Sequence, residues 1–516
     1  MTRLHRLLLI LTALLGLGCR AATGEPLTVR SLAERILAND PTVRIADQTL
    51  RLTVAAYAGT VAKAKPQLTL NSGYGLRYTP SSTTLTTQTT PPYLTVEDTR
   101  RKASHSVTAG VAVSQLLPTG GSLNLRAENA MDVETGQTDS GSGFASMEPL
   151  YSQSPKVSLT VTQPIFVNRK VVDLELFPAT FRKARIGYLK EQEANLEARN
   201  QALTQGLSLF FSVLELRRGI AALESGLELA AGRLRNLEQS YRLGAAAETD
   251  VWELRIAAGR QQESVLELRY RLAQAEAALA QSLGADSLEA FSLADVSPAL
   301  PFAYEKSAAI AEALERHPLI RQNGLGTEEK SLDRLLGGQQ HASTLSLGLS
   351  VAPRYPTDRS GSTDFGDSIS LLFGADASAD YTVSLGLNVP LYEGGKRAAD
   401  QAGYLAAEAI ARQALAVRRG AVRQEVESQL IRRDNLEMKA RLLEDNTELL
   451  RRRLEVEQGL LALGKSTELD VLARRVELES KQNEAWRARA DLYLTVLALY
   501  RAVGRDLADI IKDQQG

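Results

Sequence analysis

The sequence predicts an α+β membrane protein in which strands of a transmembrane β-barrel lead into long α-helical coiled coils, built as a two-fold internal repeat. Three observations predict this class. Short segments alternate apolar and polar side chains, as barrel strands do. Heptad spacing of apolar residues continues over very long helices. Both patterns occur twice along the chain of 516 residues.

The bulk composition excludes several classes of function. Lys and Arg total 60 and Asp and Glu total 61, which leaves no basic surplus for nucleic acid. Four His and one Cys provide little material for a zinc site and no intramolecular disulfide. The Gly-x-Ser-x-Gly motif of many hydrolases is absent. We therefore expect no enzyme activity, no metal and no cofactor.

The N-terminus has the features of a secretory signal peptide. Arg3 and Arg6 precede the largely apolar run Leu7–Leu17, which is too short to span a bilayer as a helix. Small residues follow this run. The prediction is a signal peptide over residues 1–21, which is excluded from the fold.

Cys19 directly follows the apolar run and is a candidate for lipidation. The segment Leu15 to Cys19 resembles a bacterial lipoprotein cleavage box, although Gly16 and Leu17 depart from the usual residues. Acyl chains on Cys19 would add membrane affinity. Ordinary cleavage after Ala21, which would remove Cys19, is the alternative.

The chain is predicted to contain two similar halves, repeat I over 27–300 and repeat II over 301–510. The segment ending Asn-Asp-Pro41 matches the one ending Arg-His-Pro318, and Gly284-Ala-Asp matches Gly504-Arg-Asp. Matches at a constant spacing indicate that the two halves have the same order of elements.

The strands are assigned from their alternation. Val383, Leu385 and Leu387 oppose Ser384 and Gly386, for example, which suits a strand with one face toward lipid and one toward a lumen. Single strands of this kind also fit a soluble sandwich. The intervening segments 79–104, 134–153 and 354–380 are rich in Ser, Thr, Gly and Asp and are predicted as loops. A tight turn at Pro118-Thr-Gly-Gly adds a further hairpin in repeat I. The predicted strands are about 66–78, 105–117, 122–132 and 155–166 in repeat I, and about 343–353 and 381–392 in repeat II.

Four long helices are predicted from the heptad spacing. In repeat I the apolar positions run at intervals of four and three from Leu209 to Tyr241, and most recur 220 residues later. Such a seam requires partner helices. A helix from about 395 to 462 would be about 100 Å long, more than an ordinary globular domain needs. The predicted helices are about 169–242 and 248–284, then about 395–462 and 467–504.

Specific junctions resemble those of one family. Gln163-Pro-Ile-Phe and Val389-Pro-Leu-Tyr-Glu-Gly-Gly are similar to its strand-to-helix junctions. The segments from Tyr241 to Val251 and from Gly464 to Leu472 are similar to its helical hairpin tips. On these motifs and the repeat, nearly the whole mature chain resembles the TolC-like outer membrane efflux protein family, also called outer membrane factors.

The resemblance implies a trimeric transmembrane β-barrel, with strands contributed by each protomer, continued by a long α-helical coiled-coil periplasmic tunnel. It implies an outer-membrane channel of a tripartite efflux or type I secretion system. Its partners would be two further copies, a periplasmic adaptor (membrane fusion) protein, an inner-membrane pump and outer membrane lipid, with no nucleic acid. The six candidate strands depart from the family's usual four. An exported coiled-coil structural or adhesive protein anchored at the outer membrane is the alternative.

The resemblance also assigns residues. Asp250 and Asp470 correspond to the acidic residues that constrict the tunnel aperture, although an Asp near a helix N-terminus also serves as a cap. Leu461, Ser466 and Ala473 occupy positions where the family has other residues that help to close the tunnel, so a different latch is expected. The expected adaptor-docking tips are Tyr241, Arg242, Leu243 and Gly244 in repeat I, and Leu463, Gly464, Lys465 and Ser466 in repeat II.

One competing motif is also present. Gly459, Gly464, Lys465 and Ser466 satisfy the spacing of a phosphate-binding loop. That loop requires a strand before it and a helix after it. A long helix is predicted before it here, so the sequence favours a hairpin tip.

Overall fold

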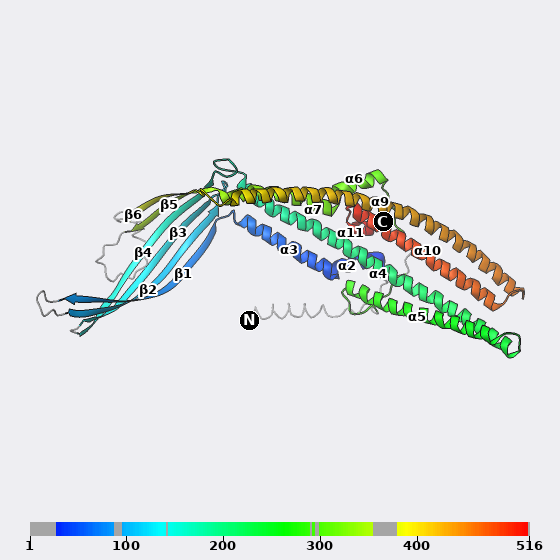
Figure 1. Ribbon diagram of the computed structural model, residues 1–516. Coiled ribbons are helices and arrows are strands. Elements are labelled where there is room, and N and C mark those ends of the chain that lie inside the picture. Colours follow the sequence, from blue (N-terminus) through cyan, green and yellow to red (C-terminus); the bar gives the residue numbers. More distant parts are fainter. Residues whose placement is uncertain are drawn as a thin grey trace, which may run out of the picture. The chain divides into compact units, whose positions relative to one another are not determined.

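The computed structural model describes residues 27–86, 95–140, 143–288, 291–294, 299–353 and 379–513. The chain divides into two compact units (Figure 1). A helical unit contains residues 1–52, 189–326 and 412–516. A second unit, which contains the described sheet, consists of residues 53–188 and 327–411. The predicted signal peptide 1–21 and Cys19 lie outside the described residues.

Six strands form one sheet in the second unit, in the order β1-β2-β3-β4-β5-β6. Every neighbouring pair is antiparallel, including β4 and β5, which are separated in sequence by four α-helices. The hairpin that was additional to the family pattern therefore continues the same sheet. The strands are β1 (Gln67–Thr86), β2 (Thr95–Leu116), β3 (Ser122–Ser140), β4 (Gly143–Ile165), β5 (Ser343–Pro353) and β6 (Ala379–Asn388).

The register aligns side chains of one polarity across all six strands. One row is wholly apolar, and it consists of Leu68, Val113, Leu125, Leu159, Leu349 and Val383. The next row, on the opposite face, consists of Thr69, Ala112, Arg126, Ser158, Ser350 and Thr382. Since successive side chains of a strand point to opposite faces, the sheet has one apolar and one mainly polar face.

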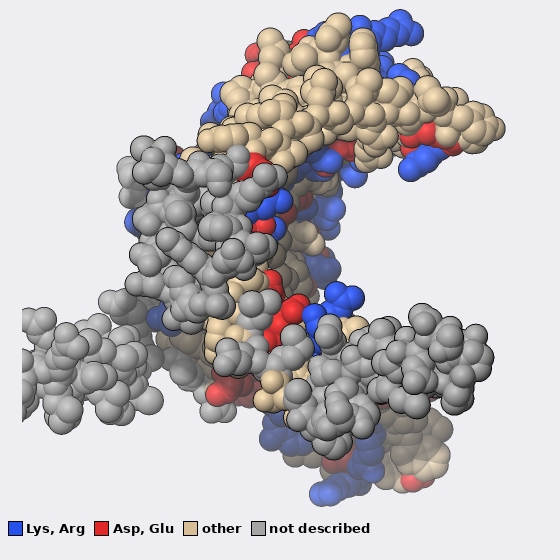
Figure 2. Space-filling view, turned by 90° about the vertical axis from the view of Figure 1, so that its left-hand side faces the viewer, with Lys and Arg blue, Asp and Glu red and all other residues tan. Residues whose placement is uncertain are grey.

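The apolar face is open to solvent in the single chain. Leu70 is 79% exposed and Tyr381 is 76% exposed, on the two edge strands of the sheet. The view from the end at which the sheet lies shows a broad uncharged surface, with Lys, Arg, Asp and Glu at its margins (Figure 2). Such an extended apolar surface indicates contact with another apolar phase or another chain.

The loop predictions in repeat I were wrong over much of their length. The segments 79–104 and 134–153 are largely strand, because β1 and β2 remain paired to Thr86 and Thr95 and β3 and β4 to Ser140 and Gly143. Thr and Ser side chains are compatible with a strand when the ladder supplies the backbone hydrogen bonds. Most of the predicted loop 354–380 lies outside the described residues. Strand β6 ends at Asn388 rather than 392, where Pro390 has no N–H to donate.

The helices follow the predicted succession. The two longest, α4 and α9, each contain 67 residues, which corresponds to about 100 Å. No helix among the described residues is both long and apolar enough to cross a membrane. The helices are α2 (Val29–Asn39), α3 (Pro41–Ala62), α4 (Leu176–Arg242), α5 (Glu248–Ser282), α6 (Lys306–Arg316), α7 (Pro318–Gly337), η1 (Gly338–His341, 3-10), α9 (Lys396–Ala462), α10 (Glu468–Val503) and α11 (Leu507–Asp513).

The heptad residues form the less exposed side of the helices in the helical unit. Val213 and Ile220 of α4, and Ala440 and Leu443 of α9, are all buried. The largest buried cluster of this unit joins α2, α4, α5, α10 and α11 through apolar and aromatic side chains, including Phe210, Phe211 and Trp486. Interhelical packing therefore fixes α4 and α10, as the seam requires.

The start of α4 differs from the prediction. The helix begins at Leu176 rather than near 169, because the residues after β4 form a tight loop. Phe166, Asn168 and Arg169 all have positive φ, a conformation that cannot continue a right-handed helix. The carboxylate of Asp173 accepts a hydrogen bond from the backbone N–H of Glu175 at 3.1 Å, and the helix starts directly after it.

Candidate functional site

The first candidate docking tip lies where α4 turns into α5. Gly244 has φ +74°, and its N–H donates to the carbonyl of Tyr241 at 2.9 Å. The N–H of Ala245 donates to the carbonyl of Ser240 at 2.8 Å. These two bonds form a Schellman cap, in which glycine takes the left-handed position at no steric cost. Leu243 is left 85% exposed at the turn.

The second tip, between α9 and α10, has the same backbone geometry. Gly464 has φ +68° and donates to the carbonyl of Leu461 at 2.9 Å, and Lys465 donates to Leu460 at 2.9 Å. Leu463 is 72% exposed. Each tip therefore presents one large apolar side chain to solvent at the same place in the turn. The remaining predicted tip residues lie beside these leucines, namely Tyr241, Arg242, Lys465 and Ser466.

The predicted aperture residues Asp250 and Asp470 both lie in the first turn of the helix that follows a tip. Asp470 is the third residue of a capping box, because its carboxylate accepts hydrogen bonds from the N–H of Thr467 at 3.2 Å and from its hydroxyl at 2.6 Å. The hydroxyl oxygen of Thr467 in turn accepts from the N–H of Asp470 at 3.2 Å. Only half of this arrangement is present in the first tip, where the N–H of Ala247 donates to Asp250 at 3.4 Å.

Both aspartates are exposed, so capping does not remove their charge from solvent. The hydrogen bonds from the hydroxyl and the N–H of Thr467 hold the pKa of Asp470 below its ordinary value, against a small opposing effect of desolvation. The positive charges of Arg474 and Arg233 act in the same direction. Asp470 is thus a fixed negative charge at neutral pH.

At the second tip, Ser466, which stands where the family has a different residue, makes a side-chain contact with the preceding helix. The hydroxyl of Ser466 donates to the carboxylate of Glu457, which also lies 3.8 Å from the guanidinium of Arg474. These contacts join α9 to α10 within one hairpin. Leu461 is half-buried and makes no polar side-chain contact.

The phosphate-loop spacing at the second tip does not occur in a phosphate-binding context. Gly459 lies inside α9, and Lys465 is in a turn between two helices rather than after a strand. Within the described ranges, no group of three or more His, Cys, Asp or Glu is arranged to hold a metal ion.

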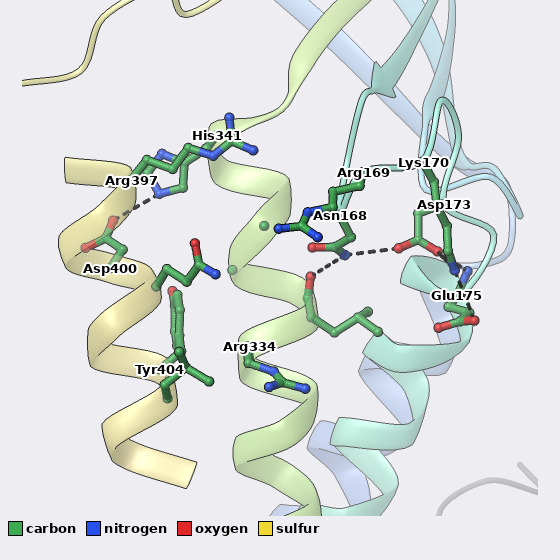
Figure 3. Close-up of a pocket in the computed structure, with 15 residues that line it drawn as sticks. Asn168, Arg169, Lys170, Asp173, Glu175, Arg334, His341, Arg397, Asp400 and Tyr404 are labelled. Carbon is green, nitrogen blue, oxygen red and sulfur yellow. Dashed lines mark hydrogen bonds and ion pairs between the residues drawn. The ribbon is translucent and has the colours of Figure 1, made fainter. Parts of the chain in front are cut away.

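A cavity of about 590 Å³ in the second unit is the main feature that the sequence did not predict. Its walls are the loop 168–175 and the first turns of α9, and Gly337 and Gly338 form its floor (Figure 3). Both glycines are required, because a Cβ at Gly337 would meet the ring of Tyr404 at 2.3 Å and one at Gly338 would meet the Asn168 amide at 2.2 Å.

The loop 168–175 is fixed by hydrogen bonds that converge on the buried Asp173. The amide of Asn168 donates to the Asp173 carboxylate and to the carbonyl of Leu335, each at 3.0 Å. Burial opposes the ionisation of Asp173, but the bonds from Asn168 and the Glu175 N–H, with the charge of Lys170, outweigh it and lower its pKa. The loop is therefore held in its left-handed conformation by a buried charge.

The other wall of the cavity carries a histidine between two acids. His341 is buried, with Nδ1 2.8 Å from Oε2 of Glu393 and Nε2 3.1 Å from Oδ2 of Asp400. Each ring nitrogen of His341 thus faces one carboxylate oxygen. His341 thereby joins the residue before β5 to the start of α9.

Only weak signals of this cavity are present in the sequence. Its residues come from three segments that are far apart in the chain, and their proximity depends on the pairing of β4 with β5. The adjacent glycines at 337–338 were the one local signal, since they mark a close approach of backbone and side chains.

Comparison with known proteins agrees with this architecture. Residues 310–505 match the model of the outer membrane efflux protein family. No curated protein matches the chain. Among solved structures, a membrane protein from Pseudomonas aeruginosa superposes with a TM-score of 0.61 at 16% identity, over 92% of this chain and 93% of that one. The Campylobacter jejuni CmeC outer membrane channel gives 0.59 at 13% identity, over 94% and 88%.

A third structure, the outer membrane protein VceC from Vibrio cholerae, gives a TM-score of 0.58 at 14% identity, over 92% of this chain and 96% of that one. At such low identity these matches establish the fold, while the match to the family model concerns the second half. The resemblance predicted from the junction and tip motifs is confirmed. Residues 310–505 are thus similar to the outer membrane efflux protein family, and the chain shares over nearly its whole length the fold of outer-membrane channel proteins.

Proposed function

We propose that this protein is the outer-membrane channel of a tripartite efflux or type I secretion system, which passively conducts substrates from a periplasmic adaptor and pump to the exterior. One observation carries the proposal. A sheet with a continuous apolar face leads into helices of 67 residues with buried heptad seams. An apolar face suits lipid, and helices of about 100 Å suit a tunnel across the periplasm.

Closure of the barrel requires further copies of the chain. Strands β1 and β6 are the edges of the sheet, and an edge left open in lipid would have unpaired backbone groups. Because all five pairings are antiparallel, β6 of one copy and β1 of the next run in opposite directions and can pair. A homotrimer, which the family fold supports, closes the ring without a free edge.

The strand number follows from this arrangement. Three copies of the six-stranded sheet make a barrel of eighteen strands, whereas the family's usual four strands per copy make twelve. With strands about 4.8 Å apart and tilted by about 40°, the diameter is about 35 Å instead of about 24 Å. The channel would therefore be wider at the membrane than the family pattern implies.

The helical tips are the proposed contacts with the adaptor. Leu243 and Leu463 are exposed apolar side chains on rigidly capped turns, which is the kind of surface that a protein partner covers. Asp250 and Asp470 lie one turn further into each hairpin and would form a ring of carboxylates in the trimer. Such a ring raises local cation occupancy at a narrow aperture. Lipidation of Cys19 stays a prediction.

Cross-linking tests the trimer and its closing edges together. Tyr74 of β1 and Val383 of β6 lie on the apolar faces of the two edge strands, and cysteines there are expected to form disulfide-linked trimers. The control pairs Tyr74→Cys with Leu349→Cys, which lies one strand further in on the same face. A purified protein that stays monomeric and needs no detergent would refute the channel and favour the exported coiled-coil protein instead.

A further inference from the structure

The cavity beside α9 contains two arginines that form no ion pair with a described acid. Arg169 enters from the loop and Arg397 from α9, on opposite sides of the cavity (Figure 3). Neither side chain has a hydrogen bond or ion pair with another described residue, and both are exposed to solvent. An anion in the cavity would accept hydrogen bonds from both guanidinium groups.

Each acid of the cavity lining lies close to a partner other than Arg169 or Arg397. Lys170 lies 3.4 Å from Asp173 and 3.2 Å from Glu175. The remaining carboxylate in the lining, Asp400, is 3.1 Å from His341. Arg334 is paired outside the lining, at 3.4 Å from Glu408. Lys170 is thus shared by two acids, and Arg169 and Arg397 are the basic groups of the lining that form no ion pair with a described residue.

The position of Arg169 is enforced rather than incidental. Its backbone has φ +67° and that of the preceding Asn168 has φ +49°, conformations that cost free energy for residues other than glycine. The Asn168 amide and the buried Asp173 maintain them. Strained backbone that is held by buried hydrogen bonds is common where a side chain must meet a ligand.

Neutral donors complete the site. Gln401 and Tyr404 of α9 also line the cavity. A guanidinium presents paired N–H groups that match the oxygens of a phosphate, and amide and hydroxyl groups can donate to the remaining oxygens. The volume of about 590 Å³ has room for a phosphate group and part of its organic substituent. We propose that this cavity binds the phosphate group of an anionic ligand, with Arg169 and Arg397 as its two cationic contacts.

The location indicates where such a phosphate is available. The loop 168–175 follows the end of β4, and His341 precedes the start of β5, so the cavity lies at the end of the sheet from which the helices leave. In a barrel this end is the periplasmic membrane surface, where lipid phosphates lie. This part of the inference rests on the proposed function, whereas phosphate binding itself does not. Free inorganic phosphate is the other source.

Binding is to be measured on the full-length protein in detergent by calorimetry with two probes. One probe is inorganic phosphate, and the other is phosphatidylglycerol in mixed micelles, compared with diacylglycerol of the same chains, which lacks the phosphate. Arg169→Gln and Arg397→Gln are each expected to weaken binding about tenfold, since each removes a charge-assisted pair of hydrogen bonds. Arg169→Lys keeps the charge and is expected to retain part of the affinity.

Arg185→Gln is the matched control, because Arg185 is an exposed arginine of α4 outside the cavity lining and its loss should leave affinity unchanged. Binding of phosphatidylglycerol but not diacylglycerol, lost in both cavity variants, identifies a lipid headgroup. Binding of inorganic phosphate with the same dependence identifies a free anion. The inference is overturned if neither probe binds, or if both glutamine variants bind as the native protein does. Conductance in planar bilayers tests the channel separately, so either proposal can fail alone.

Discussion

The sheet and the helical tips both expose large apolar side chains, but they do so in different ways. On the sheet, apolar residues form continuous rows across six strands, such as the row from Leu68 to Val383. At the tips, Leu243 and Leu463 stand singly on capped turns beside polar neighbours. A continuous apolar face suits a nonpolar solvent, whereas an isolated leucine on a rigid turn suits a pocket on a protein partner.

The difference also concerns what fixes each side chain. In the sheet, the hydrogen-bonded register decides which face a residue occupies, so a shift of one residue would reverse the polarity of both faces. At both tips a left-handed glycine forms the turn, and at the second tip a capping box also holds the start of the next helix. Substitutions in the sheet should therefore report on its surroundings, and those at the tips on local geometry and partner binding.

The largest effect is expected from a charge on the apolar face. Leu159→Lys in the central strand β4 should destabilise the membrane-inserted protein by about 2–4 kcal/mol, because a lysine at the bilayer midplane loses its hydration. Thr160→Lys, one residue further on the opposite face, should cost far less. Unfolding by urea from lipid vesicles measures both. Equal destabilisation by the two variants would refute the assignment of lipid and lumen faces.

Substitutions of the exposed tip leucines should change only the binding of the adaptor. The double variant Leu243→Ser with Leu463→Ser is expected to weaken association with the adaptor about tenfold, since each leucine would lose its buried contact. The fraction of the protein cross-linked to its adaptor in intact cells gives the measurement. Leu442→Ser is the control, because Leu442 is also exposed, at 62%, but lies within α9 away from the tip. Unchanged cross-linking in the double variant would remove the tips from the docking surface.

The two tips differ at the residue that caps the second helix, and exchanging that residue isolates its contribution. Thr467→Ala should destabilise the first turn of α10 by about 1 kcal/mol, because the hydroxyl no longer accepts the N–H of Asp470. Ala247→Thr should stabilise the start of α5 by a similar amount. Hydrogen exchange of the amides in each first turn measures both changes. A response of the same sign in the two variants would contradict the capping argument.

The smallest effect is expected from pH at the second tip. The pKa of Asp470 is lower in the folded protein than in the unfolded chain. Its ionised carboxylate therefore stabilises the fold at pH values above the unfolded pKa, and this stabilisation is lost as the pH falls through the lower folded pKa. Carboxyl chemical shifts of Asp470 follow this titration. Thr467→Ala should raise the midpoint toward the ordinary value. An unchanged midpoint in that variant would show that the hydroxyl does not hold the pKa down.

Much of the fold was predictable because its signals are local. Alternation located all six strands, and the heptad seam located the four long helices to within a few residues of their observed ends, apart from the start of α4. The predictions that were wrong also have physical reasons. Ser and Thr in 79–104 were interpreted as loop, but pairing of β1 with β2 supplies their backbone hydrogen bonds. The start of α4 was placed too early, because a left-handed backbone at Asn168 and Arg169 leaves no periodic signal.

The candidate sites differ in the same respect, because the tips have local signals in the sequence and the cavity does not. The tips could be found from Gly244 and Gly464, since a glycine after a long apolar period is a local end signal for a helix. The cavity could not be found, because Arg169 and Arg397 become neighbours only when β4 pairs with β5 and the helices start beside each other.

The periods of the strands and helices, the capped tips and the resemblance to the outer membrane efflux family could all be recognised from residues close together in the chain. The folded chain was needed to see that the extra hairpin joins one continuous sheet, which strands are its edges, and which charged groups line the cavity at the end of β4. These depend on pairings between distant segments, and no local pattern specifies which strand a given strand will choose as its neighbour.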